Sequence, residues 1–141
     1  MHIVFGGAFN GKRQYVKELL ENRKYVWYEG KLPDQAASFL VIAGIEEWVK
    51  AQLDKGIDEK DITRGIEQAI SLQPINQQIW ILTDMNRGIV PVDPLERELR
   101  DVIGRLYQHL FKKADHITRI WYGIPQTIKG ADEHENLYEN R

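Results

Sequence analysis

The residues with the clearest chemical meaning lie near the start of the chain, in the run Gly6-Gly7-Ala8-Phe9-Asn10-Gly11-Lys12-Arg13. This run fits the spacing G-x-x-x-x-G-K, in which glycines let successive backbone N–H groups turn toward a phosphate and the following helix N-terminus adds about half a positive charge. The lysine of such a loop reaches the outer phosphates, and a serine or threonine normally follows it to bind magnesium. Arg13 replaces that hydroxyl, so the sequence predicts a nucleotide-binding loop at Gly6–Arg13 that lacks a usual metal ligand.

Arg13 has two interpretations that the sequence leaves open. Its guanidinium either supplies a fixed positive charge in part of the metal's role, or it is an exposed side chain in the first turn of a helix. The second arrangement is slightly unfavourable because the helix dipole is positive at that end. Only the position of Arg13 beside Lys12 supports the first interpretation.

A second group of candidate residues follows the apolar run 78–83. Asp84 is either a base-like or metal-linked carboxylate, or the polar cap of a loop, and it joins Lys12 as a candidate catalytic residue. Arg87 and Gly88 lie on the same predicted rim, where Arg87 can contact a phosphate or the acidic edge of a substrate. We therefore expect Arg87 and Gly88 to form the substrate rim.

The elements that must position these residues follow from hydrophobic periodicity, which predicts strands alternating with helices. Such alternation indicates parallel βαβ units in a three-layer α/β fold, with ligands beyond the carboxyl ends of the strands. Glu46 and Glu47 follow the strand 39–43, where a carboxylate could hold magnesium through water, or they are exposed residues in the first turn of a helix that favour the helix dipole; we expect the second arrangement. The predicted strands are 2–5, 25–28, 39–43, 78–83 and 117–122; the helices are 12–22, 46–55, one capped by Asp58 and one from Pro94 to about Lys113; the loops at the ligand edge are 6–11, 44–47, 84–91 and 123–127.

Composition limits the class of protein. A chain of 141 residues predicts one domain, here residues 1–129, followed by a polar tail at 130–141. The 19 basic and 21 acidic residues give a net charge of −2, which argues against a nucleic-acid partner. The absence of cysteine excludes disulfides and thiolate metal sites. Without a predicted membrane span or signal peptide, we expect a cytoplasmic protein and no membrane partner.

Three further segments follow the loop in a fixed order and make a family resemblance specific. They are Gly88-Ile89-Val90-Pro91, Arg100-Asp101-Val102-Ile103-Gly104-Arg105-Leu106-Tyr107-Gln108 and Gly123-Ile124-Pro125-Gln126-Thr127-Ile128-Lys129. With the loop, they resemble the adenosylcobinamide kinase/adenosylcobinamide-phosphate guanylyltransferase family of cobalamin biosynthesis, over Met1 to Lys129. The resemblance implies a phosphate-loop fold similar to that of the recombination protein A, abridged here.

That family phosphorylates a hydroxyl of adenosylcobinamide with a nucleoside triphosphate, then transfers GMP from GTP to the new phosphate through a guanylylated histidine. The resemblance therefore implies GTP or ATP as the nucleotide, a corrinoid partner such as adenosylcobinamide, and a symmetric homo-oligomer, a trimer. In family terms Arg100, Asp101 and Arg105 belong to a framework, with Asp101 and Arg105 as an i,i+4 pair. Gly104 costs about 1 kcal/mol relative to alanine, which predicts a close helix contact there.

The chain departs from the family at three places. Arg13 replaces the metal hydroxyl, Ala43 replaces a metal-linked acid, and the segment that carries the guanylylated histidine is missing. Magnesium thus lacks its usual ligands, and the guanylyl step lacks a carrier because His109 and His116 are expected to be ordinary surface or half-buried side chains. We expect either an abridged kinase-like enzyme or an inactive nucleotide- or corrinoid-binding relative that regulates or scaffolds. The aromatic run 25–28 forms either an interface edge or a short buried strand.

Overall fold

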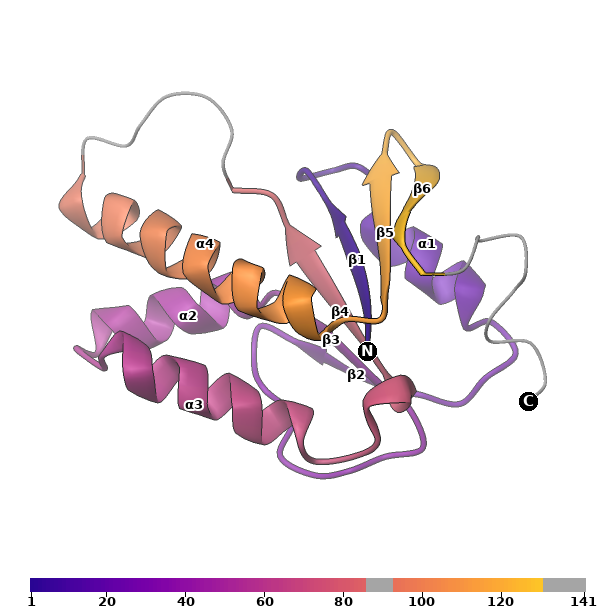
Figure 1. The fold of residues 1–141 in the computed structure, drawn as a ribbon, viewed down its shortest axis with the longest axis horizontal. Coiled ribbons are helices and arrows are strands. Elements are labelled where there is room, and N and C mark those ends of the chain that lie inside the picture. Colours follow the sequence, from indigo (N-terminus) through magenta and orange to yellow (C-terminus); the bar gives the residue numbers. More distant parts are fainter. Residues whose placement is uncertain (86–92, 131–141) are drawn as a thin grey trace.

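Six strands form a single sheet in the order β2-β3-β4-β1-β5-β6 (Figure 1). The structure is a computed structural model that describes residues 1–85 and 93–130. All neighbouring pairs are parallel except β5 and β6. The strands are β1 (His2–Gly6), β2 (Val26–Glu29), β3 (Leu40–Ala43), β4 (Gln78–Thr83), β5 (His116–Trp121) and β6 (Ile124–Lys129); the helices are α1 (Lys12–Leu19), α2 (Ile45–Asp54), α3 (Glu59–Ile70), the short 3-10 helix η1 (Ile75–Gln77) and α4 (Pro94–Lys113).

Helices cover both faces of this sheet, which confirms the predicted three-layer α/β fold. Helix α1 covers one face, and α2, α3 and α4 cover the other (Figure 1). Successive strand side chains point to opposite faces, so Ile3 packs with the three-helix side while Val4 packs with α1. None of the helices in residues 1–85 and 93–130 is long and apolar enough to cross a membrane.

The end of the sheet beside β5 corrects one expectation. Residues 123–127 were predicted to be a loop, but a turn at Tyr122 and Gly123 leads directly into β6, which pairs antiparallel with β5. Pro125 is compatible with this position because β6 is an edge strand, where a missing N–H leaves no ladder bond unmade. Most side chains of β6 are exposed, which removes the burial pattern that identifies the other strands.

The two edges of the sheet differ in their apolar side chains. At the β2 edge Tyr28 is buried and Trp27 is half-buried against the core, so the aromatic run forms the short strand that was one of its two interpretations. The β5–β6 hairpin carries more exposed large side chains, with Tyr122 and Ile124 at 79% and 68%, than β2, where Val26 is 44% exposed. This edge is the larger apolar surface of the two.

Ion pairs connect α3 to α4 along their exposed sides. Arg105 donates two hydrogen bonds of 2.8 Å to Glu59. Glu67, two turns further along α3, pairs with both His109 and Lys113. The predicted i,i+4 pair is therefore replaced by a pair between helices, because Glu59 offers Arg105 a bidentate acceptor that Asp101 only supplements.

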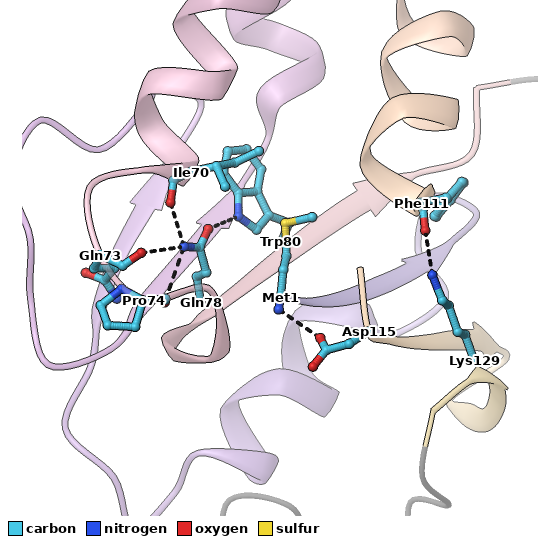
Figure 2. A network of polar contacts seen from close by, with 9 residues as sticks. All are labelled: Met1, Ile70, Gln73, Pro74, Gln78, Trp80, Phe111, Asp115 and Lys129. Atoms are coloured by element: carbon cyan, nitrogen blue, oxygen red, sulfur yellow. Dashed lines mark hydrogen bonds and ion pairs between the residues drawn. The ribbon is translucent and has the colours of Figure 1, made fainter. Parts of the chain in front are cut away.

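The connection from α3 into β4 is closed by one buried amide (Figure 2). Gln78, 1% exposed, donates a hydrogen bond of 2.9 Å to the carbonyl of Ile70, the last residue of α3. Its carbonyl oxygen accepts a 2.8 Å bond from the indole of Trp80, which is fully buried. The amide thus satisfies a helix-end carbonyl and a core N–H together.

We expect Gln78→Leu to lower the free energy of unfolding by about 2–3 kcal/mol, because it leaves the Ile70 carbonyl and the Trp80 N–H buried without this partner. Urea denaturation at pH 7 measures the change. Gln68→Leu is the matched control, because it is the same substitution at an exposed position of α3. It should change the free energy of unfolding by less than about 0.5 kcal/mol. Equal effects of the two substitutions would contradict the assigned role of Gln78.

Candidate functional site at the carboxyl ends of the parallel strands

The loop Gly6–Arg13, called the glycine loop from here on, begins where β1 has no room for a side chain. A Cβ on Gly6 would lie 2.5 Å from the carbonyl oxygen of Ile120 in β5, so only glycine fits this close approach. On the other side of β1, the N–H of Asp84 donates a 2.8 Å bond to the Gly6 carbonyl. The start of the loop is therefore fixed between the ends of β4 and β5.

Left-handed backbone shapes the rest of the glycine loop. Gly11, with φ +83°, is the N-cap of α1, a conformation that side chains rarely adopt. Phe9, with φ +62°, has the same handedness and a fully exposed ring. The Asn10 carbonyl accepts a 3.0 Å bond from the N–H of Gly123, so the β5–β6 turn supports the loop from one side.

Lys12 points into the glycine loop. Its Nζ donates a 2.6 Å bond to the carbonyl of Gly7, and the side chain is only 3% exposed. Burial, with the neighbouring charge of Arg13, lowers the pKa of Lys12 below its ordinary value, while Glu46 acts in the opposite direction. A buried ammonium held by one loop carbonyl is placed to exchange that carbonyl for a phosphate oxygen.

Arg13 leaves the glycine loop and binds the end of β2. Its Nε and Nη2 donate bonds of 2.9 and 2.8 Å to the two carboxylate oxygens of Glu29. Glu29 also accepts a 3.1 Å bond from the Trp27 indole, and the Arg13 hydrogen bonds hold the pKa of Glu29 below its ordinary value. A Cβ on Gly44 would lie 2.5 Å from Glu29 Oε2, so the glycine at that position makes room for this carboxylate.

The Arg13–Glu29 pair differs from both interpretations of Arg13, as a charge that replaces the metal and as an exposed side chain. Arg13 is half-buried rather than a free exposed side chain, and its two donors toward Glu29 are directed at a carboxylate rather than at the inside of the loop. The sequence could not show this partner, because Glu29 lies 16 residues away on another element. The guanidinium lies beside the loop with its charge already balanced.

Glu46 is a site residue whose burial differs from the exposure expected from the sequence. Its neighbour Glu47 is exposed in the first turn of α2, but Glu46 is half-buried and bonds to α4. Its Oε2 accepts a 2.5 Å bond from the Tyr107 hydroxyl, which lies 2.7 Å from the carbonyl oxygen of Thr83. Burial raises the pKa of Glu46, and burial together with the Glu46 charge raises the pKa of Tyr107.

Asp84 follows β4, and its backbone N–H bonds to Gly6 at the start of the glycine loop. The two candidate catalytic residues, Lys12 and Asp84, therefore lie on the side of the sheet where the parallel strands have their carboxyl ends. Asp84 is half-buried. The candidate rim residues Arg87 and Gly88 lie outside the described residues. Residues 131–141 of the predicted tail, with His134, lie outside them as well.

The donor set at the glycine loop does not fit magnesium. A magnesium ion is held by hard oxygen ligands, usually carboxylates, a loop hydroxyl and phosphates. Arg13 presents a cation in place of the hydroxyl, and buried Ala43 stands at the carboxyl end of β3 where the family resemblance expects an acid. Within residues 1–85 and 93–130, no group of three or more His, Asp or Glu side chains is arranged to hold a metal ion.

The described histidines lie away from the glycine loop. His109 pairs with Glu67 on α3, as an ordinary half-buried side chain was expected to do. His116 corrects the same expectation, because it is buried at the amino end of β5 and packs against His2 with ring centroids 4.1 Å apart. Both His2 and His116 lie at the amino ends of their strands, whereas the glycine loop follows the carboxyl end of β1.

Gly104 also corrects an expectation. It was predicted to allow a close helix contact, but no described residue comes within 4 Å of a Cβ built at this position. The space beside it is a cavity between α4 and the carboxyl ends of β1 and β4. A close helix contact is the usual reason for a glycine inside a helix, and hydrophobic periodicity carries no signal of an empty volume.

We expect the stability difference between the wild type and Glu46→Gln to depend on pH. The folded chain holds the Glu46 proton at higher pH than the unfolded chain, so its carboxyl adds stability at low pH that disappears as pH rises. The wild type should lose stability relative to Glu46→Gln as pH rises above about 4, the ordinary pKa of a glutamate. Urea unfolding at several pH values measures this difference.

Glu47→Gln is the control for that experiment, because it makes the same change at the exposed neighbouring position. Its stability difference from the wild type should stay nearly constant over the same pH range. A Glu46→Gln curve parallel to the control would contradict a buried, proton-holding Glu46.

Comparison with known families supplies an independent assignment. The model described as cobinamide kinase / cobinamide phosphate guanyltransferase matches residues 29–128, which is 100 of the 141 residues. No curated protein gives a significant match. The match begins after the glycine loop, so it covers Glu29, Glu46, Asp84 and the segment 100–108 of α4 but not residues 6–13. The mostly parallel α/β sheet agrees with the phosphate-loop NTPase fold of that family, and the match supports a role in cobalamin biosynthesis. The chain therefore belongs to the cobinamide kinase / cobinamide phosphate guanyltransferase family.

Proposed function

We propose that the protein binds a nucleoside triphosphate, GTP or ATP, in the glycine loop and transfers its outer phosphoryl group to a hydroxyl of adenosylcobinamide. The observation that carries this proposal is the placement of Lys12, a buried ammonium that points into a loop of glycines at the N-terminus of α1. Backbone N–H groups, the helix dipole and a lysine together form a site for phosphate oxygens. Asp84, fixed to Gly6 by its backbone, supplies a carboxylate at the same edge.

In this reaction the acceptor hydroxyl gives its proton to Asp84, and the hydroxyl oxygen forms a bond to the γ-phosphorus. The bond from that phosphorus to the bridging β-γ oxygen breaks, and the nucleoside diphosphate leaves with the electron pair. Lys12 stabilises the charge on the transferred group. Glu46 and Tyr107 act by position, since their hydrogen bond joins α2 to α4 behind the lysine.

We do not extend the proposal to guanylyl transfer. That step needs a histidine near the nucleotide. Of the described histidines, His109 lies on α4 against Glu67 of α3, and His2 and His116 pack together at the amino ends of β1 and β5. The connection from β2 to β3 spans only residues 30–39 and contains no histidine. Kinase-type chemistry therefore agrees with more of the described residues than nucleotidyl transfer does.

Nucleotide binding is the first test, with isothermal titration of GTP and ATP in either magnesium or EDTA. We expect binding of at least one nucleotide with affinities within about threefold in the two buffers, because the loop lacks the ligands that fix magnesium. Lys12→Met should weaken binding by at least about tenfold, since it removes the ammonium but keeps the length of the side chain.

Lys17→Ala is the control, because Lys17 is an exposed lysine of the same helix α1. It should leave the affinity unchanged, and thermal melting should show that both variants are folded. Absence of binding by the wild type, or equal binding by Lys12→Met, would overturn the nucleotide site. Binding that requires magnesium would show that another ligand set holds the metal.

A second function is favoured by the combined loss of metal ligands and carrier histidine. The protein is then an inactive nucleotide- or corrinoid-binding relative that regulates or scaffolds a complete enzyme. Incubation with adenosylcobinamide and a γ-labelled nucleotide separates the two functions. We expect label in the corrinoid product and its loss in Asp84→Asn, whereas bound nucleotide without any turnover would favour the inactive relative.

The symmetric homo-oligomer, a trimer by family resemblance, remains a prediction. The apolar side chains that stay exposed on the β5–β6 hairpin support an assembly through that edge, because exposed edge strands with large apolar residues are unusual in isolated proteins.

A further inference from the structure

A cavity of about 200 Å³ lies between α4 and the carboxyl ends of β1 and β4. Arg100, Gly104 and Gln108 line one wall at intervals of four residues, which places them along a single face of α4. Phe5 and Tyr107 provide aromatic surface, and Asp84 lies at the strand end. The cavity thus combines an apolar base with a few polar groups, as ligand sites do.

Gly104 is the residue that marks this cavity as more than a packing defect. Glycine in the middle of a helix lowers helix stability, because it gives up more backbone freedom than any other residue. Gly6 is explained by the close approach of Ile120, and Gly56 and Gly123, which have open space around them, are explained by their positive φ angles; neither reason applies to Gly104. No described residue approaches a Cβ at Gly104, so its lack of a side chain serves the volume of the cavity.

The cavity adjoins the glycine loop through two shared residues. Asp84 lines the cavity and donates its backbone N–H to Gly6, the first residue of the loop. Tyr107 lines the cavity with its ring, while its hydroxyl bonds Glu46, whose charge acts on Lys12. A group held in the cavity would therefore lie beside the outer end of a nucleotide bound in the loop.

Size and charge narrow the class of ligand. A volume of about 200 Å³ is below the range of roughly 300–1,000 Å³ typical of sites that enclose a whole small molecule, so the cavity fits one arm of a larger ligand. Its wall carries one guanidinium, at Arg100, and one carboxylate, at Asp84. Because these two charges balance, the cavity is less suited to an anion, such as another phosphate, than to a neutral, aliphatic arm with hydrogen-bonding groups.

We propose that this cavity is the acceptor pocket, in which the neutral, hydroxyl-bearing arm of the acceptor passes along Gly104 and presents its hydroxyl to Asp84. This inference rests on the proposed kinase-type function. The body of the acceptor remains outside the cavity, and the polar stripe of Arg100 and Gln108 binds the polar groups of the arm.

The test fills the cavity from the Gly104 position. Gly104→Ala and Gly104→Leu are titrated with adenosylcobinamide and, separately, with GTP and ATP. We expect the leucine variant to lose at least about tenfold in affinity for adenosylcobinamide, the alanine variant to lose less, and both to bind nucleotide within about twofold of the wild type. Gly104→Ala should also melt at higher temperature than the wild type, because alanine favours the helix.

Asp101→Leu is the matched control, since Asp101 is an exposed residue of α4 that is not among the described residues lining the cavity. It should bind adenosylcobinamide like the wild type. The pocket assignment is overturned if Gly104→Leu binds adenosylcobinamide normally, or if the wild type binds nucleotide but no adenosylcobinamide. Failure of the wild type to bind any nucleotide would instead overturn the proposed function, so the two failures are distinguishable.

Discussion

Parallel pairing of β1 with both β4 and β5 is the constraint on which the site depends. It brings the carboxyl end of β1 against Ile120 on one side and Asp84 on the other, and it leaves Gly6 without space for a side chain. The chain must then turn away from the sheet, and α1 begins within six residues. The turn places Lys12 at the start of α1, where its ammonium reaches back to the Gly7 carbonyl.

Charged groups around this turn are matched in pairs drawn from different elements. Arg13 of α1 binds Glu29 of β2, while Lys12 of α1 is influenced by Glu46 of α2, which in turn accepts from Tyr107 of α4. No single helix or strand therefore creates the electrostatics of the site. A triphosphate entering the glycine loop brings several negative charges, and the ammonium of Lys12 is the cation already directed inward.

Much of the fold was predictable because buried parallel strands and amphipathic helices leave strong periodic signals, and strand β4 and helix α4 were placed within a residue of their observed bounds. Strand β6 was missed because an exposed edge strand containing Pro125 carries no such signal. At the candidate site, the sequence predicted the turn between β1 and α1, because its residues are neighbours in the chain. Glu46 and Gly104 were misjudged because a hydroxyl 61 residues away and an empty volume decide their surroundings.

The ion pair between Arg13 and Glu29 has a consequence for which residues can be exchanged beside the loop. Glu29 depends on Arg13 for its charge partner, and the space it occupies depends on the missing Cβ of Gly44. A serine at position 13 would leave the Glu29 carboxylate beside the glycine loop without its guanidinium, where it would repel any anion that enters the loop. Positions 13 and 29 are therefore coupled, so a hydroxyl at position 13 should be combined with the loss of the charge at position 29.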